Sequence, residues 1–515
     1  MDSGMDAEII HRKIKSLAAL ETTVAGWKTS GQTVVHCHGV FDLLHPGHIA
    51  HFEAARRQGD RLIVTLTPDR FVNKGPNRPV FDEDLRAHTL ASMEVIDAVA
   101  INEWPTAVET IKKLRPDVYV KGKDYEDVSD DVTGKIAGER EAVEQNGGRL
   151  HITREITFSS SNLINSRLSS YPRETEDWLS VFRNKYSERK ILDSFTKIEG
   201  LRILVVGEAI LDEYVFCEGL GKSSKDPILA FHDRGLERYA GGSTAVANHL
   251  STFCKEITFV SVVGDLSEDQ DFIRGALGDN VTPIFIERAS APTITKRRFV
   301  DTHTKAKLIE IYEMADDVIP RETEAELLSV LRDEITDHDL VVVVDYGHGM
   351  MTDSVIKKVC EKAPFLAVNT QHNAGNRGFN TIARYPKADY ACMNGYESAI
   401  ESRLRNVPTQ DQIAQLKGSV NCSKITVTLG SEGSMHFYNE GESITAPALA
   451  FRVVDRVGAG DAVLALTAPL VYAGVHWEIV AFVTNVVGAE VVGNLGTGDH
   501  LHRSGLQNHI RSLLK

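Results

Sequence analysis

Hydrophobic residues near the start of the chain recur at the spacing of a helix. They stand mostly three or four positions apart over residues 7–27, with polar and charged residues between them. This spacing is that of an amphipathic α-helix with one buried face. The apolar positions are Ile9, Ile10, Ile14, Leu17, Leu20, Val24 and Trp27. We therefore predict an N-terminal helix within residues 1–30.

From residue 31 to residue 170, short apolar runs alternate with longer amphipathic stretches. The apolar runs are TVVHCHGVF, RLIVTLT, AVAIN, VYVKG and RLHIT, and the predicted helices between them cover residues 47–58, 82–94, 105–114 and 134–146. Strands that alternate strictly with helices form a parallel, doubly wound sheet. The pattern thus predicts an α/β domain over residues 31–170.

A polar segment and a second alternating series complete the chain. Residues 171–199 place apolar side chains at helical spacing, which predicts one connecting helix. Over residues 200–515, runs such as LRILVVG, EITFVSVVG, DLVVVVDYG and ITVTLG again alternate with helical stretches. A polar alternating insert near residues 213–240 predicts a small accessory sheet. The expected architecture is two α/β domains joined by a helix.

Composition and charge narrow the class of protein. The 515 residues carry a formal net charge of −15, whereas broad contact with nucleic acid or an anionic membrane needs a basic face. No apolar run reaches the roughly 18 residues of a membrane helix, and no signal-peptide core is present. The six cysteines form no CxxC pair, as in a reducing compartment. We expect a soluble cytoplasmic protein whose partners are small molecules, neither nucleic acid nor membrane.

Two histidines three residues apart follow the first predicted strand, in the stretch GVFDLLHPGHIAHFEAAR. A zinc site, a phosphate-binding site and an ordinary turn are the alternatives for His45 and His48. Zinc needs further ligands, which His36, His38 and His51 could supply. A phosphate site is favoured because ligands bind at the carboxyl ends of parallel strands and helix N-termini attract anions.

Residues at other strand ends also favour phosphate. Gly39 and Gly47 allow a ligand to approach the backbone closely, and Asp42 follows the strand. Such a set suits a nucleoside triphosphate whose α-phosphate is attacked by another phosphate, because cations stabilise the charge that develops. The basic residues that recur at or after later strand ends are Lys74, Arg78, Lys121 and Lys123.

The motif and its companions resemble the cytidylyltransferase-like nucleotidyltransferases over roughly residues 31–167. HPGH matches the HxGH signature of that family, and RLIVTLTPD, NRPV, PDVYVKGKDY and SSSNLI follow in the family's order. The resemblance implies that His45, His48 and Lys74 act on the nucleotide phosphates, with Mg²⁺ arriving on the nucleotide. The nucleotide-binding residues that it implies are Gly39, Phe41, Asp42, Lys121, Gly122, Asp124, Ser159, Ser160 and Ser161.

A glycine-rich turn before a predicted helix marks a second candidate site, in VVDRVGAGDAVLA at residues 453–465. Backbone N–H groups at such a turn can bind an anion, and Asp461 in the first helical turn can accept a proton. A tight turn with Asp461 as a helix cap is the alternative. Upstream, GLGKSS at residues 219–224 is no P-loop, because Phe216 stands where that motif needs glycine.

This turn and the glycine pair in YAGGSTAVANHL resemble the ribokinase-like (PfkB) carbohydrate kinases over about residues 200–515. The resemblance implies that Asp461 is the catalytic base. Asn394 and Glu397 in NGYE would organise Mg²⁺ through water. The other implied contacts are Gly458, Ala459 and Gly460 to the transferred phosphoryl group, Gly430 on the ATP side, and Asp212, Gly241 and Gly242 on the sugar side.

Together the two halves resemble the bifunctional heptose 7-phosphate kinase/heptose 1-phosphate nucleotidyltransferase family of lipopolysaccharide precursor (ADP-heptose) synthesis. Further matches are PTITKRRFV, DYGHGM and VVGNLGTGD, although the transferase half comes first here. The resemblance implies a kinase that phosphorylates a sugar phosphate at the anomeric position with ATP. The transferase half would then use ATP or CTP and release pyrophosphate. A homodimer is also expected.

Several positions depart from the family pattern. Ala245 replaces an asparagine, Val457 a threonine and Glu310 an arginine, and AVNTQHN replaces an Asp-Pro-Lys stretch. These positions leave the exact sugar open. One alternative function is a nucleotidyltransferase with a non-catalytic kinase-like module. Another is a polyol-phosphate cytidylyltransferase, whose usual Arg-Thr-x-Gly-Ile-Ser segment is EITFSSSNLI here.

Overall fold

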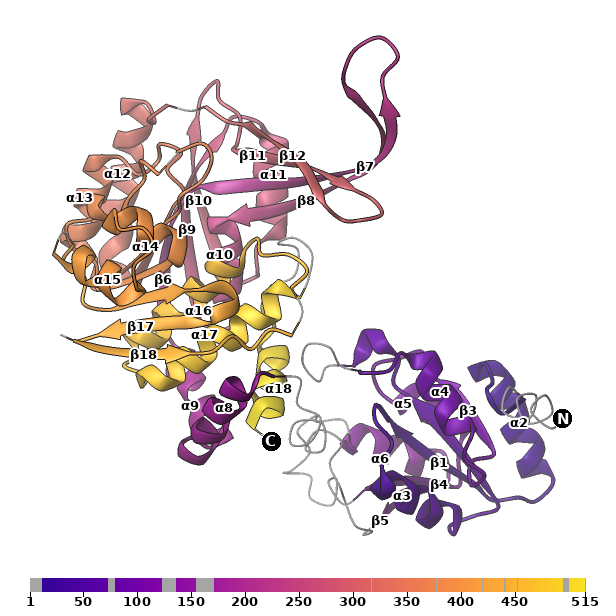
Figure 1. The fold of residues 1–515 in the computed structure, drawn as a ribbon. Coiled ribbons are helices and arrows are strands. Elements are labelled where there is room, and N and C mark those ends of the chain that lie inside the picture. The colour runs from indigo at the N-terminus through magenta and orange to yellow at the C-terminus, as the bar shows by residue number, and fades with distance from the viewer. Residues whose placement is uncertain are drawn as a thin grey trace. The chain divides into compact units, whose positions relative to one another are not determined.

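The computed structural model contains two compact units, Met1–Ser170 and Tyr171–Leu514 (Figure 1). The structure describes residues 12–72, 79–122, 136–153, 171–315, 317–376, 378–418, 420–439, 441–451, 453–493 and 500–514. Within these ranges no helix has the length and apolar character needed to cross a membrane.

A five-stranded parallel sheet in the order β3-β2-β1-β4-β5 forms the centre of the first unit. Its strands are β1 (Val34–Gly39), β2 (Arg61–Leu66), β3 (Ala98–Ile101), β4 (Val118–Gly122) and β5 (Arg149–Thr153). The helices are α2 (Leu17–Thr29), α3 (Pro46–Arg56), α4 (Glu83–Ala91), α5 (Val108–Leu114) and α6 (Ile136–Gln145), with a 3-10 turn at Asp69–Phe71. The predicted parallel α/β fold of this region is confirmed.

Alternate residues of β1 pack into cores on opposite faces of this sheet. Val35 and Cys37 lie in one core with side chains of α3 and α4, and Val34 lies in another with side chains of α2 and α5. Nearly the whole strand is buried, as expected of a central parallel strand. Helices therefore cover both faces, which is the doubly wound arrangement.

The helix α2 begins later than the helix predicted from apolar spacing. Ile14 forms a parallel bridge with Val99, and the Lys15 N–H donates to the Val99 carbonyl (2.9 Å). Ser16 then caps α2 by accepting a hydrogen bond from Ala19 N (3.3 Å). The segment before the cap thus pairs with β3, although its apolar residues continue the helical period.

A nine-stranded sheet in the order β10-β9-β6-β13-β14-β15-β16-β17-β18 forms the centre of the second unit. It is parallel from β10 to β16, while β17 and β18 are antiparallel. Its strands are β6 (Arg202–Gly207), β9 (Glu256–Gly264), β10 (Val281–Arg288), β13 (Leu340–Asp345), β14 (Leu366–Thr370), β15 (Tyr390–Asn394), β16 (Ile425–Thr428), β17 (Ser434–Tyr438) and β18 (Glu442–Ala446).

Helices surround this sheet. They are α8 (Arg173–Lys185), α9 (Glu188–Thr196), α10 (Ser243–Ser251), α11 (Ser267–Ala276), α12 (Arg321–Glu334), α13 (Asp353–Lys362), α14 (Gly395–Ser402), α15 (Thr409–Lys417), α16 (Ala459–Tyr472), α17 (Trp477–Val492) and α18 (Arg503–Leu514). Short 3-10 turns lie at Ile335–Asp337, Ile382–Arg384 and Gly430–Glu432. The helix α16 is buried along most of its length, and it packs against α10, α17 and the sheet.

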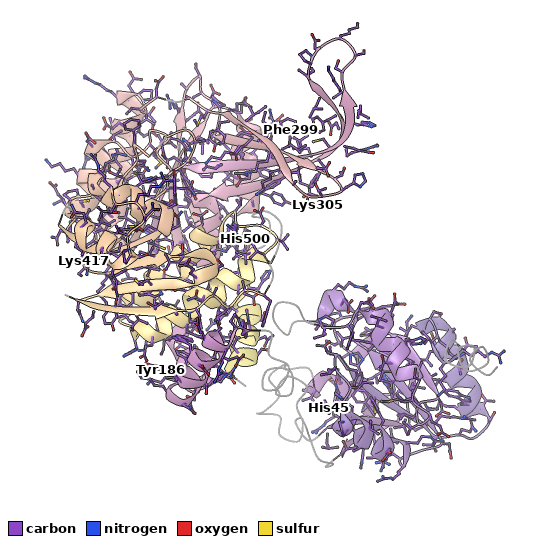
Figure 2. All side chains as sticks on the ribbon, in the orientation of Figure 1. His45, Tyr186, Phe299, Lys305, Lys417 and His500 are labelled. Atoms are coloured by element: carbon purple, nitrogen blue, oxygen red, sulfur yellow. The ribbon has the colours of Figure 1, made fainter. Side chains whose placement is uncertain are left out.

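A separate four-stranded sheet in the order β12-β11-β7-β8 confirms the predicted accessory sheet. Its strands are β7 (Ala209–Lys222), β8 (Leu229–Gly242), β11 (Thr295–Asp301) and β12 (Lys307–Glu313). The hairpin of β7 and β8 extends away from the body of the second unit (Figure 1). The sheet is larger than the predicted insert because β11 and β12 join it; Figure 2 labels Phe299 on β11 and Lys305 at the turn that follows.

Two helices stand where one connecting helix was predicted over residues 171–199. Tyr186 is extended between α8 and α9, and Ser187 caps α9 by accepting a hydrogen bond from Lys190 N (3.3 Å). A serine cap inside an apolar periodic stretch is the signal that divides it. Both helices belong to the core of the second unit through Leu179, Phe182, Ile191 and Phe195.

The chain order in each unit creates a point where the loops after two central strands diverge. β1 lies between β2 and β4 in the first unit, and β6 lies between β9 and β13 in the second. Ligands bind in parallel sheets at such points, outside the carboxyl ends of the strands. The loops after β1, β4, β6 and β13 are therefore the places to look for functional residues.

Candidate active sites

The two motif histidines of the first unit lie at the N-terminus of α3. His45 is the N-cap of this helix, and its Nδ1 accepts a hydrogen bond from Gly47 N (3.1 Å). The ring centroids of His45 and His48 are 4.0 Å apart, at an interplanar angle of 31°. Paired imidazoles at a helix N-terminus, which carries a partial positive charge, form a suitable place for phosphate. Figure 2 labels His45 in the first unit.

Phe41 and Gly39 set the path of the loop that carries these histidines. Phe41 has a φ of 51°, in a region that non-glycine residues seldom occupy. Its ring meets His48 edge-on at 5.6 Å and lies 5.2 Å from Phe52. A Cβ atom at Gly39 would lie 2.9 Å from Phe41 Cζ, so a larger residue would displace the ring. Both predicted site residues therefore shape the loop.

Asp42 ties the same loop to the segment before α4. Its buried Oδ1 accepts hydrogen bonds from Val80 N (2.5 Å) and Phe81 N (3.4 Å). The buried Arg86 of α4 also holds this loop in place by donating a hydrogen bond to the Val40 carbonyl (2.5 Å). The Asp42 carboxylate thus holds backbone in place, a role that the resemblance does not imply.

Lys121 reaches the site from the end of β4. Its ammonium pairs with Glu139 of α6 (3.0 Å) and donates to the His38 carbonyl (3.4 Å). Glu139 also accepts a hydrogen bond from Tyr119 (3.0 Å), and this group is buried. A buried pair of this kind fixes where the positive charge lies. Glu139 was not among the residues predicted from the sequence. Gly122, next to Lys121, leaves open space where a side chain would be.

The other histidines of the zinc alternative are bound to threonines. His36 Nε2 and His38 Nδ1 both lie against Thr65 Oγ1 (2.7 and 2.8 Å). His51 Nδ1 lies 2.7 Å from Thr153 Oγ1. Among the residues that the structure describes, no three His, Cys, Asp or Glu side chains are grouped to hold a metal ion. Lys74, Asp124, Ser159, Ser160 and Ser161 lie outside the described residues, and their roles stay predictions.

The second candidate site centres on the N-terminus of α16. Gly458 is its N-cap, with a φ of 79° that favours glycine, and Ala459, Gly460 and Asp461 form the first turn. The Tyr346 hydroxyl donates to Asp461 Oδ1 (2.9 Å). Burial raises the pKa of Asp461 to about 7, which suits a carboxylate that exchanges a proton near neutral pH.

Glu208 holds the loop that presents Tyr346. It follows β6, and its carboxylate accepts hydrogen bonds from Tyr346 N (2.9 Å) and His348 N (3.1 Å), in the loop after β13. Burial raises the pKa of Glu208. Its carboxylate connects the loop after β6 to the loop after β13, and these loops diverge at the centre of the sheet. Sequence analysis missed it, although a glutamate directly after a buried strand was a usable signal.

Asp212 is brought to the same end of the unit by the accessory sheet. Its carboxylate forms an ion pair with Arg298 of β11, whose Nε also pairs with Glu310 of β12 (2.8 Å). A Cβ atom at Gly241 would collide with Asp212 Oδ2, so Gly241 makes room for this carboxylate. Glu310, one of the departures from the family pattern, therefore adds a negative charge beside Arg298.

Gly242 opens α10 next to this group. Its φ is 61°, and a Cβ atom there would lie 2.7 Å from the Glu208 carbonyl oxygen. The hydroxyls of Ser243 and Thr244, in the first turn, are buried and have no hydrogen-bond partner among the residues described. Ala245, another departure, is buried in the same turn. The start of α10 thus adds polar groups beside the two loops at the centre of the sheet.

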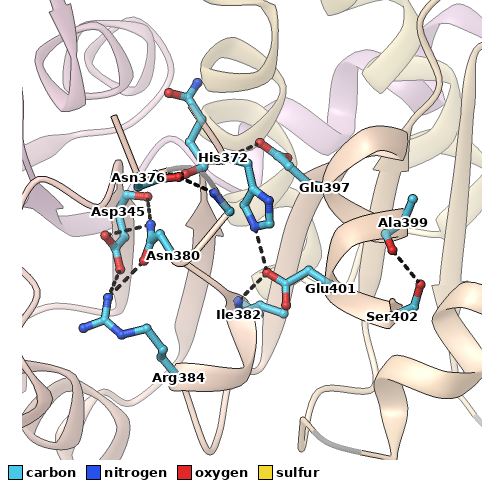
Figure 3. A network of polar contacts seen from close by, with 12 residues as sticks. Asp345, His372, Asn376, Asn380, Ile382, Arg384, Glu397, Ala399, Glu401 and Ser402 are labelled. Atoms are coloured by element: carbon cyan, nitrogen blue, oxygen red, sulfur yellow. Dashed lines mark hydrogen bonds and ion pairs between the residues drawn. The ribbon is translucent and has the colours of Figure 1, made fainter. Parts of the chain in front are cut away.

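Asn394 and Glu397 form a capping box at the start of α14. Asn394 Oδ1 accepts from Glu397 N (2.9 Å), and Glu397 Oε2 accepts from Asn394 N (2.8 Å). Glu397 is 3% exposed, so it is no ordinary surface acid, and burial raises its pKa to about 7. Its second oxygen accepts from His372 N (3.3 Å), in the AVNTQHN stretch (Figure 3).

The loop after β14 that carries His372 is held by a polar network (Figure 3). His372 Nε2 lies 3.3 Å from Glu401 Oε1, and both side chains are buried. Asn380 donates to the Asp345 carbonyl (2.8 Å), and Asp345 accepts from Tyr385 (2.8 Å). The sequence that replaces the family's Asp-Pro-Lys stretch therefore builds its own support for Glu397.

The turn before α16 is tied to the accessory sheet. Lys307 of β12 pairs with Asp455 (2.7 Å), and Asp455 Oδ1 accepts from Val457 N (3.2 Å). Val457, a departure from the family, leads directly into Gly458. Gly430 lies at the end of β16 with a φ of 61°. The predicted residues of this site thus come from the accessory sheet, two strand ends and the starts of α10, α14 and α16.

Comparisons with known proteins match both units. A family model described as pfkB family carbohydrate kinase matches residues 201–503, and one described as cytidylyltransferase-like matches residues 36–166. The fold of the second unit is similar to that of phosphofructokinase-2 from Escherichia coli, in a structure with potassium. That likeness has a TM-score of 0.51 at 14% identity and covers 61% of this chain and 100% of that chain.

Curated relatives match the cytidylyltransferase-like region. The bifunctional protein HldE of Methylobacillus flagellatus is 39% identical over 160 residues, which is 31% of this chain and 31% of that protein. HldE of Azorhizobium caulinodans is 45% identical over 143 residues, 27% of this chain and 28% of that protein. The match thus spans about a third of each relative's length. The chain belongs to the pfkB family of carbohydrate kinases and carries a cytidylyltransferase-like domain before the kinase domain.

Proposed function

We propose that the protein is a bifunctional enzyme of nucleotide-sugar synthesis. The second unit transfers a phosphoryl group from ATP to the anomeric hydroxyl of a sugar phosphate similar to heptose 7-phosphate. The product is a bisphosphate, and a separate phosphatase must remove its original phosphate ester by hydrolysis. The first unit then couples the remaining sugar 1-phosphate to a nucleotide from ATP or CTP and releases pyrophosphate. The observation that carries this proposal is Asp461, bound to Tyr346 at the glycine-rich start of α16, in one chain with the histidine pair at α3.

The kinase step needs a base because its acceptor is an alcohol. Asp461 takes the proton of the anomeric hydroxyl as that oxygen attacks the γ-phosphorus, and ADP leaves with the electrons of the broken P–O bond. The N–H groups at the start of α16 stabilise the charge of the phosphoryl group in transfer. Tyr346 orients the Asp461 carboxylate through its hydrogen bond.

The side-chain oxygens of Asn394 and Glu397 are ligands of the kind that Mg²⁺ prefers, often through water. One oxygen of Glu397 accepts from Asn394 N in the capping box and the other from His372 N, which leaves each a further lone pair for a water molecule. When bound with ATP, Mg²⁺ would neutralise part of the phosphate charge. These two residues would hold its water shell in place.

The transferase step needs no comparable base because its acceptor is already a phosphate anion. An oxygen of the sugar 1-phosphate attacks the α-phosphorus of the nucleotide, and the bond to pyrophosphate breaks. His45, His48 and Lys121 stabilise the extra charge on the phosphorus centre and the leaving group. We assign this step to a domain of residues 31–170 and the kinase to residues 200–515. Residues 1–30, which contain α2, precede the first domain, and residues 171–199, which contain α8 and α9, stand between the two domains.

We also propose that the protein is a cytoplasmic homodimer. Its six cysteines are all free and buried, as in a reducing compartment. Exposed apolar side chains on the accessory sheet favour contact with a second copy of the chain, because such groups on a projecting sheet lose water when covered. They are Leu220, Leu229, Phe231, Leu236, Ile309 and Ile311.

The test is a coupled assay of the full chain. Incubation with Mg²⁺, ATP and heptose 7-phosphate should yield a heptose bisphosphate. A phosphatase then converts this product to heptose 1-phosphate, which should react with the nucleotide to give a nucleotide sugar and pyrophosphate. Mass spectrometry identifies each product and shows whether ATP or CTP is used. If the protein phosphorylates no member of a panel of heptose and hexose phosphates while its transferase activity is intact, the kinase half is a binding module. Activity on polyol phosphates instead would favour the cytidylyltransferase alternative.

A further inference from the structure

A buried lysine of the accessory sheet has no ion-pair partner among the described residues. Lys296 on β11 is 5% exposed and forms no salt bridge with any residue that the structure describes. Its ammonium lies over the rings of Tyr312 (5.1 Å) and Tyr346 (5.4 Å). Burial lowers the pKa of Lys296, while Asp212, Glu310 and Asp461 oppose that shift. A buried positive charge without a paired anion is costly, so a ligand that supplies the anion is expected.

The neighbouring carboxylates are occupied by an arginine. In the sheet, Lys296 stands opposite Asp212 on one side and Tyr312 on the other, and Arg298 stands opposite Glu310. Arg298 takes both carboxylates, since it pairs with Asp212 and with Glu310 (2.8 Å). Of these two cations on β11, Arg298 therefore has ion-pair partners, whereas Lys296 has none among the described residues.

A histidine with no hydrogen-bond partner for its ring lies in the same place. His348, in the loop after β13, is 4% exposed, and neither Nδ1 nor Nε2 has a hydrogen-bond partner in the part of the chain that the structure describes. Its ring is 6.4 Å from that of Tyr312, the residue that also contacts Lys296. Buried polar atoms in proteins almost always have a partner, so two empty ring nitrogens indicate a ligand or water. Glu208 fixes the backbone of His348 and thereby the position of the ring.

This pair lies beside the group that accepts the proton in the proposed reaction. Tyr346 contacts the Lys296 ammonium with its ring and Asp461 with its hydroxyl (2.9 Å). A sugar whose anomeric hydroxyl meets Asp461 would therefore have another part of its structure near Lys296 and His348.

We propose that Lys296 and His348 form a subsite for the phosphate ester that the sugar already carries, so that the kinase selects phosphorylated over free sugars. This inference rests on the proposed kinase function. Lys296 supplies a point charge, and His348 donates one N–H to a phosphate oxygen. The phosphoryl group in transfer is the competing occupant, since it too is an anion near Asp461.

Steady-state kinetics of the full chain separate these occupants. Lys296→Met keeps the length of the side chain but removes the charge. We expect the KM for heptose 7-phosphate to rise about 10–100-fold, as for a lost charge-assisted hydrogen bond, while the KM for the free heptose and kcat change less than about threefold. His348→Phe should give a smaller rise. Lys357→Met, on the exposed face of α13, is the matched control and should change nothing.

The outcomes are distinct. A fall in kcat with unchanged KM would place Lys296 on the phosphoryl group in transfer and overturn the proposal. An equal loss of activity with the phosphorylated and the free sugar would indicate a packing role and would also overturn the proposal. The same holds if the wild-type protein shows no preference for the phosphorylated sugar.

Calorimetric titration with heptose 7-phosphate gives a readout that does not depend on turnover. Binding that is lost in Lys296→Met, in a protein with no kinase activity, would support the subsite while the proposed function fails. If Lys296→Met does not fold, the same titration of His348→Phe decides, and undiminished binding there would contradict the proposal.

Discussion

The two candidate sites stand at equivalent points of their sheets but are built from different kinds of side chain. In the first unit, the start of α3 supplies the imidazoles of His45 and His48, and the end of β4 supplies the ammonium of Lys121. In the second unit, the loops after β6 and β13 bring carboxylates together, Glu208 and, through Tyr346, Asp461. The proposed acceptors explain the contrast. A phosphate acceptor is already a nucleophilic anion and needs only charge stabilisation, whereas an alcohol needs a base.

The strongest test of this contrast is to remove the base. Asp461→Asn keeps the hydrogen bond geometry with Tyr346 but cannot take up the proton. Kinase activity should fall about 10²–10⁴-fold, with pyrophosphate release from supplied sugar 1-phosphate unchanged. A parallel loss of both activities would show that the two units do not work separately.

The converse change removes a charge-stabilising group from the first unit. His45→Ala or His48→Ala should lower the transferase rate about 10²–10³-fold, the usual effect of losing one such group. Kinase turnover in the same protein is the internal control and should stay within about twofold. His88→Ala, on α4, is a matched control for the loss of a histidine. Full transferase activity in both site variants would return the pair to the ordinary-turn alternative.

The contrast also predicts different pH dependence. Because the pKa of Asp461 is raised to about 7, a growing fraction of the base is protonated as pH falls below 7. Kinase kcat/KM should therefore drop about tenfold per pH unit below that point and level off above it. The transferase, which uses no carboxylate base, should show no such step near pH 7. A flat kinase profile between pH 5 and pH 8 would argue against Asp461 as the base.

The smallest effect concerns a glycine that makes room for a site residue. Gly241→Ala places a Cβ against Asp212 Oδ2 and should destabilise the second unit by about 1–3 kcal/mol, with a lowered kcat/KM for the sugar. Gly26→Ala, in α2, meets no atom within 4 Å and should stabilise the first unit by about 0.5–1 kcal/mol. Thermal unfolding of both variants measures these shifts. Equal effects would mean that the space beside Asp212 is not needed.

Sequence patterns predicted the parallel sheets because buried strands leave long apolar runs, as in LRILVVG and DLVVVVDYG. They did not predict β11 and β12 in the accessory sheet, because this hairpin joins the sheet through β7, which is distant in the chain. In the sequence, the break between α8 and α9 is marked only by Ser187, a residue type that caps helices. Periodicity gives the side of an element that is buried, but not which distant strand it joins.

Motif residues such as His45 and Asp461 could be predicted because they stand at strand-to-helix turns with glycine beside them. Glu139 and Lys296 could not be identified in the same way. Their contacts with Lys121 and Tyr346 join separate elements of the fold, and no local spacing records such contacts. AVNTQHN showed only that a familiar stretch was missing, whereas the structure shows His372 in a network with Glu397.

The separate cores of the two units have a consequence for how the protein unfolds. Among the described residues, no hydrophobic cluster contains side chains from both units. Cooperative melting requires shared burial, so calorimetry should resolve two transitions, and a single melting temperature would not define the stability of the chain. Each nucleotide should then raise only the transition of the unit that binds it. Heat capacity alone could thus report which half of the molecule an unknown substrate has entered.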